Sequence, residues 1–189
     1  MPGRLVYVMG PSGSGKDTVL LGLQSRLDGC HLARRIITRP VEACEGHAAS
    51  VSIDEFNRLE AQGALAMAWR ANGLAYGISG GIDAVLDGGG DVLINGSRAY
   101  LPQARARYAN LLAVLLTVDP HILRCRLRAR GRESEAEIDA RMARNSRFVG
   151  ATAVGTASAG GVFVIDNSGN VEQAVQSLVI FLQQARLCA

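Results

Sequence analysis

Short apolar runs alternate along this chain with longer segments in which apolar residues recur every three or four positions. The runs predict buried strands over residues 5–9, 35–38, 65–69, 91–95, 111–118 and 161–166. The periodic segments predict helices over residues 17–27, 53–62, 82–86, 101–108, 121–130, 135–147 and 171–187. Residues 41–49 and 150–161 show neither pattern and are expected to be loops. Strands that alternate with helices indicate an α/β fold with a parallel sheet flanked by helices.

Two local signals mark the borders of elements in the first half of the chain. Ser52 followed by Glu55 has the spacing of a capping box, which places a helix N-terminus at residue 53. The dipeptide Asn72-Gly73 is typical of a tight turn.

A glycine-rich segment separates the first predicted strand from the first predicted helix. It reads Gly-Pro-Ser-Gly-Ser-Gly-Lys-Asp-Thr and matches the pattern G-x-x-x-x-G-K. Between a strand and a helix, this pattern forms a phosphate loop, in which backbone amides and the helix N-terminus bind a triphosphate. The sequence therefore predicts a P-loop NTPase fold with ATP as cofactor. The expected cofactor-binding residues are Gly10, Pro11, Ser12, Gly13, Ser14, Gly15, Lys16, Asp17 and Thr18.

Lys16 is the only lysine of the chain, and every other member of its 20 Lys and Arg residues is arginine. A compact ammonium can reach phosphates between backbone amides, whereas the planar fork of arginine fits that position poorly. We expect Lys16 to act in catalysis by bridging the β- and γ-phosphates. A tight turn with a surface lysine is the simpler alternative, and the lack of any other lysine disfavours it.

Asp17 stands where this loop usually has Ser or Thr, whose hydroxyl faces Mg²⁺. A carboxylate is a suitable hard ligand for Mg²⁺, so Asp17 is the candidate metal ligand. An acidic residue in the first turn also stabilises a helix through the helix dipole. Both interpretations stay open.

Eight arginines lie between Arg124 and Arg147, and three of them surround Gly131. By itself this segment suits a solvated pair of helices. Together with a phosphate loop, it favours a mobile lid over residues 128–147 that closes on the phosphates and neutralises charge. The expected catalytic arginines of the lid are Arg128, Arg130 and Arg132.

Composition narrows the class of protein. With 189 residues, 48% of them hydrophobic and 20% charged, the chain suits one globular domain. A net charge of +3 gives no reason to expect nucleic acid as a partner. The four cysteines lack metal-ligand spacing, and the sequence shows no signal pattern and no apolar run of membrane length. A cytoplasmic protein without a membrane partner is expected.

The order of these landmarks resembles the guanylate kinase branch of the P-loop kinases over nearly the whole chain. The resemblance implies one domain over residues 1–189, with an acceptor-binding segment at about 34–80. It also implies that Arg39, in Thr-Arg-Pro, and Tyr76 bind the acceptor and that Asn167 closes the nucleotide site. Tyr76 could instead only pack. Arg34, Arg35 and Arg70 are weaker candidates for acceptor binding and could be ordinary surface charges.

Three departures from that branch concern its acceptor site. Glu42 stands near the place of a second phosphate-binding arginine, and Ala48 near that of a tyrosine. The acidic residue that reads guanine should fall near Met67, where the chain has no carboxylate. Since a pocket without that acceptor would bind guanine poorly, GMP is not the expected substrate.

A closer resemblance is to the ribose 1,5-bisphosphate phosphokinase family of phosphonate degradation. It rests on the phosphate loop and on residues 37–39, 69–74, 91–98 and 101–108. It implies transfer of the ATP γ-phosphoryl group, with Mg²⁺, to a small sugar phosphate, giving 5-phosphoribosyl 1-diphosphate. The residues that it implies for the acceptor are Arg39, Tyr76, Asn95, Ser97 and Arg98. A guanylate kinase and a non-catalytic binding module remain the alternatives, and the oligomeric state, a homodimer included, stays open.

Overall fold

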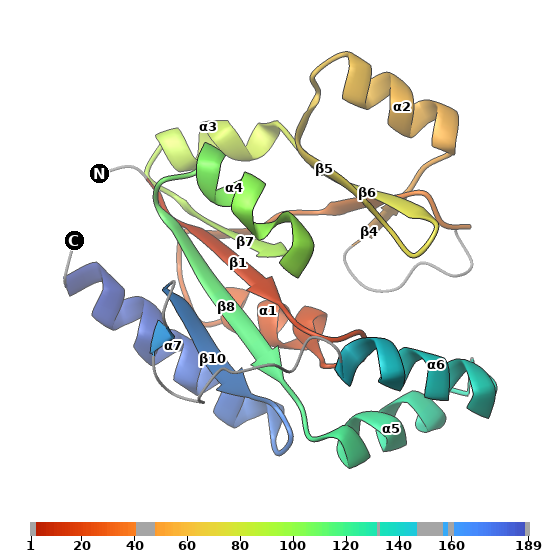
Figure 1. Cartoon of the computed structure of the whole chain (residues 1–189). Coiled ribbons are helices and arrows are strands. Elements are labelled where there is room, and N and C mark those ends of the chain that lie inside the picture. Colours follow the sequence, from red (N-terminus) through yellow and green to blue (C-terminus); the bar gives the residue numbers. More distant parts are fainter. Residues whose placement is uncertain (1–2, 41–47, 132, 147–156, 159–160, 188–189) are drawn as a thin grey trace. The chain divides into compact units, whose positions relative to one another are not determined.

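The computed structural model describes residues 3–40, 48–131, 133–146, 157–158 and 161–187 (Figure 1). The chain divides into two compact units. Unit 1 comprises residues 1–7 and 27–112, and unit 2 comprises residues 8–26 and 113–189. The division falls within strands β1 (Leu5–Met9) and β8 (Leu111–Thr117), so each unit holds a part of both.

Unit 1 holds most of the short strands. They are β2 (Cys30–Leu32), β3 (Arg35–Ile37), β4 (Ala48–Ser50), β5 (Leu65–Ala71), β6 (Leu74–Ser79) and β7 (Asp91–Asn95). Its helices are α2 (Ile53–Ala61), α3 (Gly81–Asp87), the 3-10 helix η2 (Arg98–Tyr100) and α4 (Leu101–Arg107). One sheet has the order β2-β7-β1, with β2 parallel to β7. A second sheet has the order β4-β3-β6-β5, in which β6 is antiparallel to both neighbours.

The core of unit 1 lies where residues of the two sheets meet. Tyr7, Met67, Ile78 and Ile94 are buried in one apolar cluster. These side chains come from β1, β5, β6 and β7, so residues of both sheets bury their apolar area together. This packing fixes the second sheet against the strands of the first, since buried apolar area is the main favourable term in folding.

Unit 2 contains the remaining strands of the first sheet and four helices among the described residues. Its further elements are α1 (Lys16–Gln24), α5 (Pro120–Ala129), α6 (Glu135–Ser146), β9 (Ala157–Ser158), β10 (Val162–Asp166) and α7 (Val171–Leu187). The order is β1-β8-β10-β9, with β10 parallel to β8 and antiparallel to β9. Helices α1 and α7 pack on each other, and α5 lies beside α6 (Figure 1). Leu123, Leu127 and Ile138 form the small core between α5 and α6.

The predicted strands and helices are present, with ends that differ by a few residues. The helix expected over 17–27 ends at Gln24, and the one expected from residue 121 begins at Pro120. Asp119 caps the latter by accepting from His121 N and Ile122 N at 2.8 and 3.3 Å. Ser52 caps α2 as expected, because its hydroxyl accepts from Glu55 N at 3.1 Å.

The sequence prediction of loops was wrong at two short strands. The loop expected over 41–49 includes the first two residues of β4, and the rest of it lies outside the described residues. The loop expected over 150–161 contains β9. Both strands have two or three residues, too few for a repeating pattern. The short β2 and the strand β6 also went unpredicted.

None of the helices in the described residues has the length and apolar character needed to cross a membrane.

Candidate active site

The phosphate loop lies in unit 2 between β1 and α1. Gly15 caps α1 with φ 84°, in the left-handed region, and a Cβ there would lie 2.7 Å from Asn167 Nδ2. Glycine is therefore needed at this position, both for the backbone conformation and for the space. The loop leads directly into the N-terminus of α1, where backbone N–H groups and the helix dipole favour an anion.

Asn167 holds the loop from the end of β10. It is buried, its Nδ2 donates to the carbonyl of Ser14 at 2.7 Å, and its backbone N donates to Thr117 O at 2.8 Å. Within the described part of the chain, Asn167 Oδ1 and Ser14 Oγ have no hydrogen-bond partner. Buried polar atoms of this kind are rare, and a bound water, an ion or a catalytic role can account for them.

Lys16 turns back onto its own loop. Its Nζ donates to the carbonyls of Gly10 and Pro11 at 3.0 and 2.9 Å. Pro11 O also accepts from Ser14 N at 3.1 Å. The carbonyls of the loop thus fix the position of the ammonium.

Asp17 lies in the first turn of α1, half-buried. Among the described residues no three His, Cys, Asp or Glu side chains cluster in a way that could hold a metal ion. A single carboxylate fits Mg²⁺ of the kind that kinases use, because that ion keeps several waters and is bound by one or two carboxylates and by substrate phosphates. Both interpretations of Asp17 are compatible with this position.

The arginine-rich segment consists of α5 and α6. Arg128 is exposed and forms a bidentate ion pair with Glu135, at 2.6 and 2.7 Å. Arg130 is exposed at the end of α5, where Gly131 takes a left-handed conformation with φ 62°. Arg132 lies outside the described residues.

A different arginine of this segment contacts the phosphate loop. Arg141, in α6, donates from Nη1 to Ser12 Oγ at 2.6 Å and is paired with Glu133. From the sequence, Arg141 was noted only as one of the eight arginines between Arg124 and Arg147, with no role assigned to it. The available signal was its helical register, since Arg141 lies three residues after the buried Ile138.

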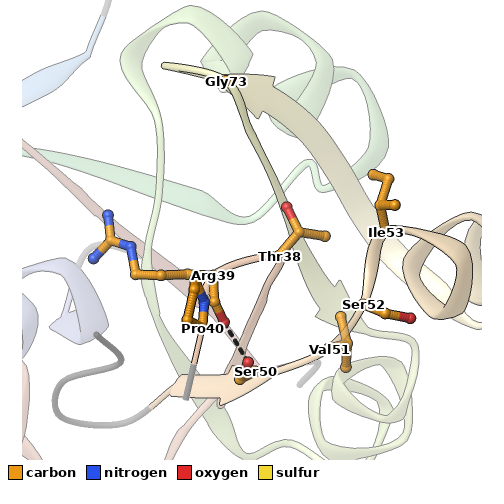
Figure 2. A pocket seen from close by; sticks show the side chains of 8 residues that line it. All are labelled: Thr38, Arg39, Pro40, Ser50, Val51, Ser52, Ile53 and Gly73. Atoms are coloured by element: carbon orange, nitrogen blue, oxygen red, sulfur yellow. Dashed lines mark hydrogen bonds between the residues drawn. The ribbon is translucent and has the colours of Figure 1, made fainter. Parts of the chain in front are cut away.

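The residues predicted to bind the acceptor lie in unit 1. Thr38 and Arg39 follow β3, and they help to line a pocket of about 470 Å³. The other lining residues are Pro40, Ser50, Val51, Ser52, Ile53 and Gly73. Figure 2 shows that the guanidinium of Arg39 extends away from Thr38 and Ile53. The backbone carbonyl of Arg39 accepts from Ser50 Oγ (Figure 2).

Tyr76 lies within a row of aromatic rings. It stacks on Trp69 with centroids 5.6 Å apart and planes at 7°, and Trp69 in turn contacts Tyr100 at 5.6 Å. Tyr76 is half-buried, so packing and substrate contact are both open to it. The row brings the β5–β6 hairpin next to the segment that follows β7.

That segment holds the other three acceptor candidates. Asn95 is buried at the end of β7, and Ser97 is fixed by two hydrogen bonds to the hydroxyl of Tyr7. Arg98 is half-buried at the start of η2, and burial lowers the pKa of its guanidinium. Even so, arginine stays charged at neutral pH. All five predicted acceptor residues thus lie in unit 1.

Met67, the position expected to read a guanine base, is 1% exposed and packs in the core of unit 1. Ala48 is in β4, and Glu42 lies outside the described residues.

The fold and the loop define the class of protein, a P-loop kinase. A solved guanylate kinase from Anaplasma phagocytophilum superposes with a TM-score of 0.70 at 17% identity, covering 97% of this chain and 86% of that chain, which shows the shared fold. The family model described as "AAA domain" matches residues 6–147, and the chain belongs to that family.

Closer relatives narrow the class. The ribose 1,5-bisphosphate phosphokinase PhnN of Pseudomonas paraeruginosa is 51% identical over 100% of both chains. The protein with the same name from Pseudomonas fluorescens is 51% identical over 96% of both. The chain belongs to the ribose 1,5-bisphosphate phosphokinase family.

Proposed function

We propose that this protein transfers the γ-phosphoryl group of ATP to the 1-phosphate of ribose 1,5-bisphosphate, forming 5-phospho-α-D-ribose 1-diphosphate and ADP. The observation that carries the proposal is the similarity, over the full length, to relatives with this named activity. The burial of Met67 agrees with it, because an acceptor without a base needs no base-reading carboxylate.

The reaction joins two phosphates. An oxygen of the acceptor 1-phosphate attacks the γ-phosphorus, a new P–O bond forms, and the bond from the γ-phosphorus to the β–γ bridging oxygen breaks. The attacking oxygen is already an anion, so the chain needs no general base. Positioning and charge neutralisation supply the rate enhancement.

Each unit would bind one of the two substrates. The loop amides and Lys16 bind the triphosphate of ATP, and Lys16 follows the charge as the γ-phosphoryl group moves. Asn167 stabilises the conformation of the loop through its hydrogen bond to the carbonyl of Ser14. The lid over residues 128–147 neutralises the charge of the phosphates through Arg128, Arg130, Arg132 and Arg141. The acceptor is bound by Arg39, Tyr76, Asn95, Ser97 and Arg98.

Asp17 is the residue that would hold Mg²⁺, directly or through water, and the ion would supply charge neutralisation at the β- and γ-phosphates. A cytoplasmic location belongs to the same proposal, since ATP and sugar phosphates are found there. So does a small-molecule acceptor rather than a macromolecular partner.

A panel of acceptors tests the proposal. The purified protein is incubated with ATP, Mg²⁺ and, in separate reactions, ribose 1,5-bisphosphate or GMP, and the products are identified by phosphorus NMR. We expect a diphosphate signal only with ribose 1,5-bisphosphate. Formation of GDP at a higher rate would identify a guanylate kinase, and absence of ATP binding by calorimetry would identify a non-catalytic module.

A further inference from the structure

Arg141 is bound to two different parts of unit 2. Its Nη1 donates to Ser12 Oγ of the phosphate loop at 2.6 Å, and its Nη2 donates to Oε1 of Glu133. Its Nε is buried and has no hydrogen-bond partner within the part of the chain that the structure describes. The orientation of the guanidinium therefore depends on Ser12 at one side of the fork and on Glu133 at the other.

Apolar packing fixes the helix that carries Arg141. Leu123 and Leu127 of α5 form the small core with Ile138, which lies in α6. A Cβ at Gly13 would lie 3.0 Å from atoms of both leucine side chains, so this core extends to the phosphate loop. The packing determines where the backbone of Arg141 lies. It leaves the direction of a long, flexible side chain to the hydrogen bonds at its end.

Glu133 lies directly before the N-terminus of α6, in a segment held by a reciprocal pair of hydrogen bonds. Ser134 N donates to Glu137 Oε2 at 2.8 Å, and Glu137 N donates to Ser134 Oγ at 3.4 Å. This is the pattern of a capping box. Arg141 follows the cap by about two helical turns, so Glu133 reaches it along one side of the helix.

The pair of Glu133 and Arg141 is more shielded from water than a neighbouring pair, Arg124 with Asp139, which joins α5 to α6. The side chains of Glu133 and Arg141 are 21% and 26% exposed, whereas that of Asp139 is 58% exposed. Exposed ion pairs are screened and contribute little, and partly buried pairs are screened much less. The shielding favours a role for Glu133 beyond that of a surface charge.

We propose that Glu133 orients Arg141 toward the phosphates of ATP and is a positioning residue for phosphoryl transfer. This assignment rests on the proposed function, in which Arg141 neutralises charge at the triphosphate. The carboxylate binds Nη2 and thereby sets the plane of the fork, so that Nη1 faces the phosphate loop. Glu133 acts through Arg141 and does not itself contact a substrate.

The sign of the effect separates orientation from charge. A carboxylate near a triphosphate repels it. If Glu133 had no positioning role, its removal would leave kcat unchanged or raise it. If Glu133 orients Arg141, its removal lowers kcat, although the site becomes more positive.

The test compares two substitutions of Glu133 that both remove the charge. Glu133→Ala also removes the hydrogen-bond acceptor and should lower kcat by about 10-fold, as expected for a misplaced charged group. Glu133→Gln keeps an oxygen acceptor at the same reach and should keep kcat within about threefold of wild type. The KM for ribose 1,5-bisphosphate should stay unchanged in both, because the residues predicted to bind it lie in unit 1. Thermal unfolding checks the fold of each variant.

A double-mutant cycle shows whether Glu133 acts through Arg141. In an Arg141→Gln background, Glu133→Ala should change kcat by no more than about twofold, because the group that it orients is gone. Asp139→Ala is the matched control, since it removes an ion pair between α5 and α6. It should keep kcat within about twofold of the parent protein in both backgrounds. ATP affinity, measured by calorimetry without an acceptor, should follow the same pattern and does not depend on turnover.

Two results would overturn the assignment. One is a kcat of Glu133→Ala that equals or exceeds that of wild type. The other is a loss in Glu133→Ala that persists in full in the Arg141→Gln background, which would indicate a structural role of the turn before α6. Failure of the proposed function has a different signature, namely a wild-type protein that forms no product from ribose 1,5-bisphosphate. The calorimetric cycle with ATP would then still show whether Glu133 acts through Arg141.

Discussion

Tyr7 and Ser97 are joined by two hydrogen bonds through one hydroxyl group. Tyr7 Oη donates to the carbonyl of Ser97 at 2.8 Å and accepts from its backbone N at 2.9 Å. Tyr7 is fully buried in β1, so a strand of the core directly fixes the backbone of the segment that carries three acceptor candidates. The position of these candidate residues is therefore linked to the stability of the core.

This link predicts a change of stability with pH. Burial raises the pKa of Tyr7, because the phenolate would lose its solvation, and this outweighs the lowering by the hydrogen bond from Ser97. An unfolded tyrosine ionises near pH 10, whereas the folded one keeps its proton, so the unfolded state binds fewer protons above that pH. The stabilisation from neutral Tyr7 is thus complete below about pH 10 and is lost as the pH rises further.

The comparison of wild type with Tyr7→Phe isolates this effect. Urea unfolding should show the variant less stable by about 1–3 kcal/mol at pH 8, since it leaves Ser97 without its partner. Between pH 9.5 and 11 (a range set by the tyrosine pKa of about 10) the difference should shrink. Tyr108, whose pKa is also raised by burial, is present in both proteins and cancels. Parallel pH profiles would contradict the interpretation.

Gly96 should not tolerate a side chain. A Cβ at this position would lie 2.1 Å from Cζ of Tyr7, which is far inside van der Waals contact. Gly96→Ala should lower stability by about 1–3 kcal/mol, the typical penalty of overpacking, and should raise the KM for the acceptor because the segment must shift. Gly81→Ala is the matched control, since its nearest neighbour would be 3.7 Å away. An acceptor KM that changes equally in the two variants would argue against the contact with Tyr7.

Lys16→Met should abolish transfer and leave the fold intact. Removing one preorganised charge from a phosphoryl-transfer site lowers kcat by about 100- to 1,000-fold or more. Lys16→Arg should recover little activity, because the guanidinium is bulky and planar. A coupled assay gives kcat, and thermal unfolding checks the fold. Full turnover by Lys16→Met would rule out the phosphate-loop assignment.

Arg141 should matter more to turnover than its sequence context suggests. Its contact with Ser12 places it at the phosphate loop, so Arg141→Gln should lower kcat by about 10- to 100-fold through lost charge neutralisation. Arg124→Gln removes an arginine of α5 that pairs with Asp139 and leaves the loop contact in place. Steady-state rates within twofold of wild type are expected for that control. Equal losses in both variants would indicate that α5 and α6 merely need their ion pairs.

The sequence predicted the parts of this fold that repeat a pattern over many residues. The phosphate loop was recognisable because its glycines, its lysine and its flanking strand and helix occur in a fixed order. Strand β6 was missed because Gly77 reads as a breaker, although the Asn72-Gly73 turn before it was predicted. The structure shows why glycine is accepted there, since Phe56 and Leu65 fill the space beside it.

The site was predicted less completely, and for a different reason. Arg35, Arg70 and Arg141 look alike in sequence, because each is one arginine among 19. They differ only in what the fold brings next to them, which is the Tyr76 ring for Arg35 and Glu60 for Arg70. For Arg141 that neighbour is Ser12 of the phosphate loop. Contacts between residues distant in sequence carry no periodic signal, so spacing alone could not rank these side chains.

Lys16 also makes the chain suitable for selective chemical labelling. It holds the only ε-amino group in the sequence, and that group donates to two carbonyls of the loop that would receive the triphosphate. Apart from the N-terminus, an amine-directed acylating reagent therefore has a single target, and it lies in the loop proposed to bind ATP. Mass spectrometry of the labelled peptide, with and without nucleotide, would measure occupancy of that site without any turnover or any engineered probe.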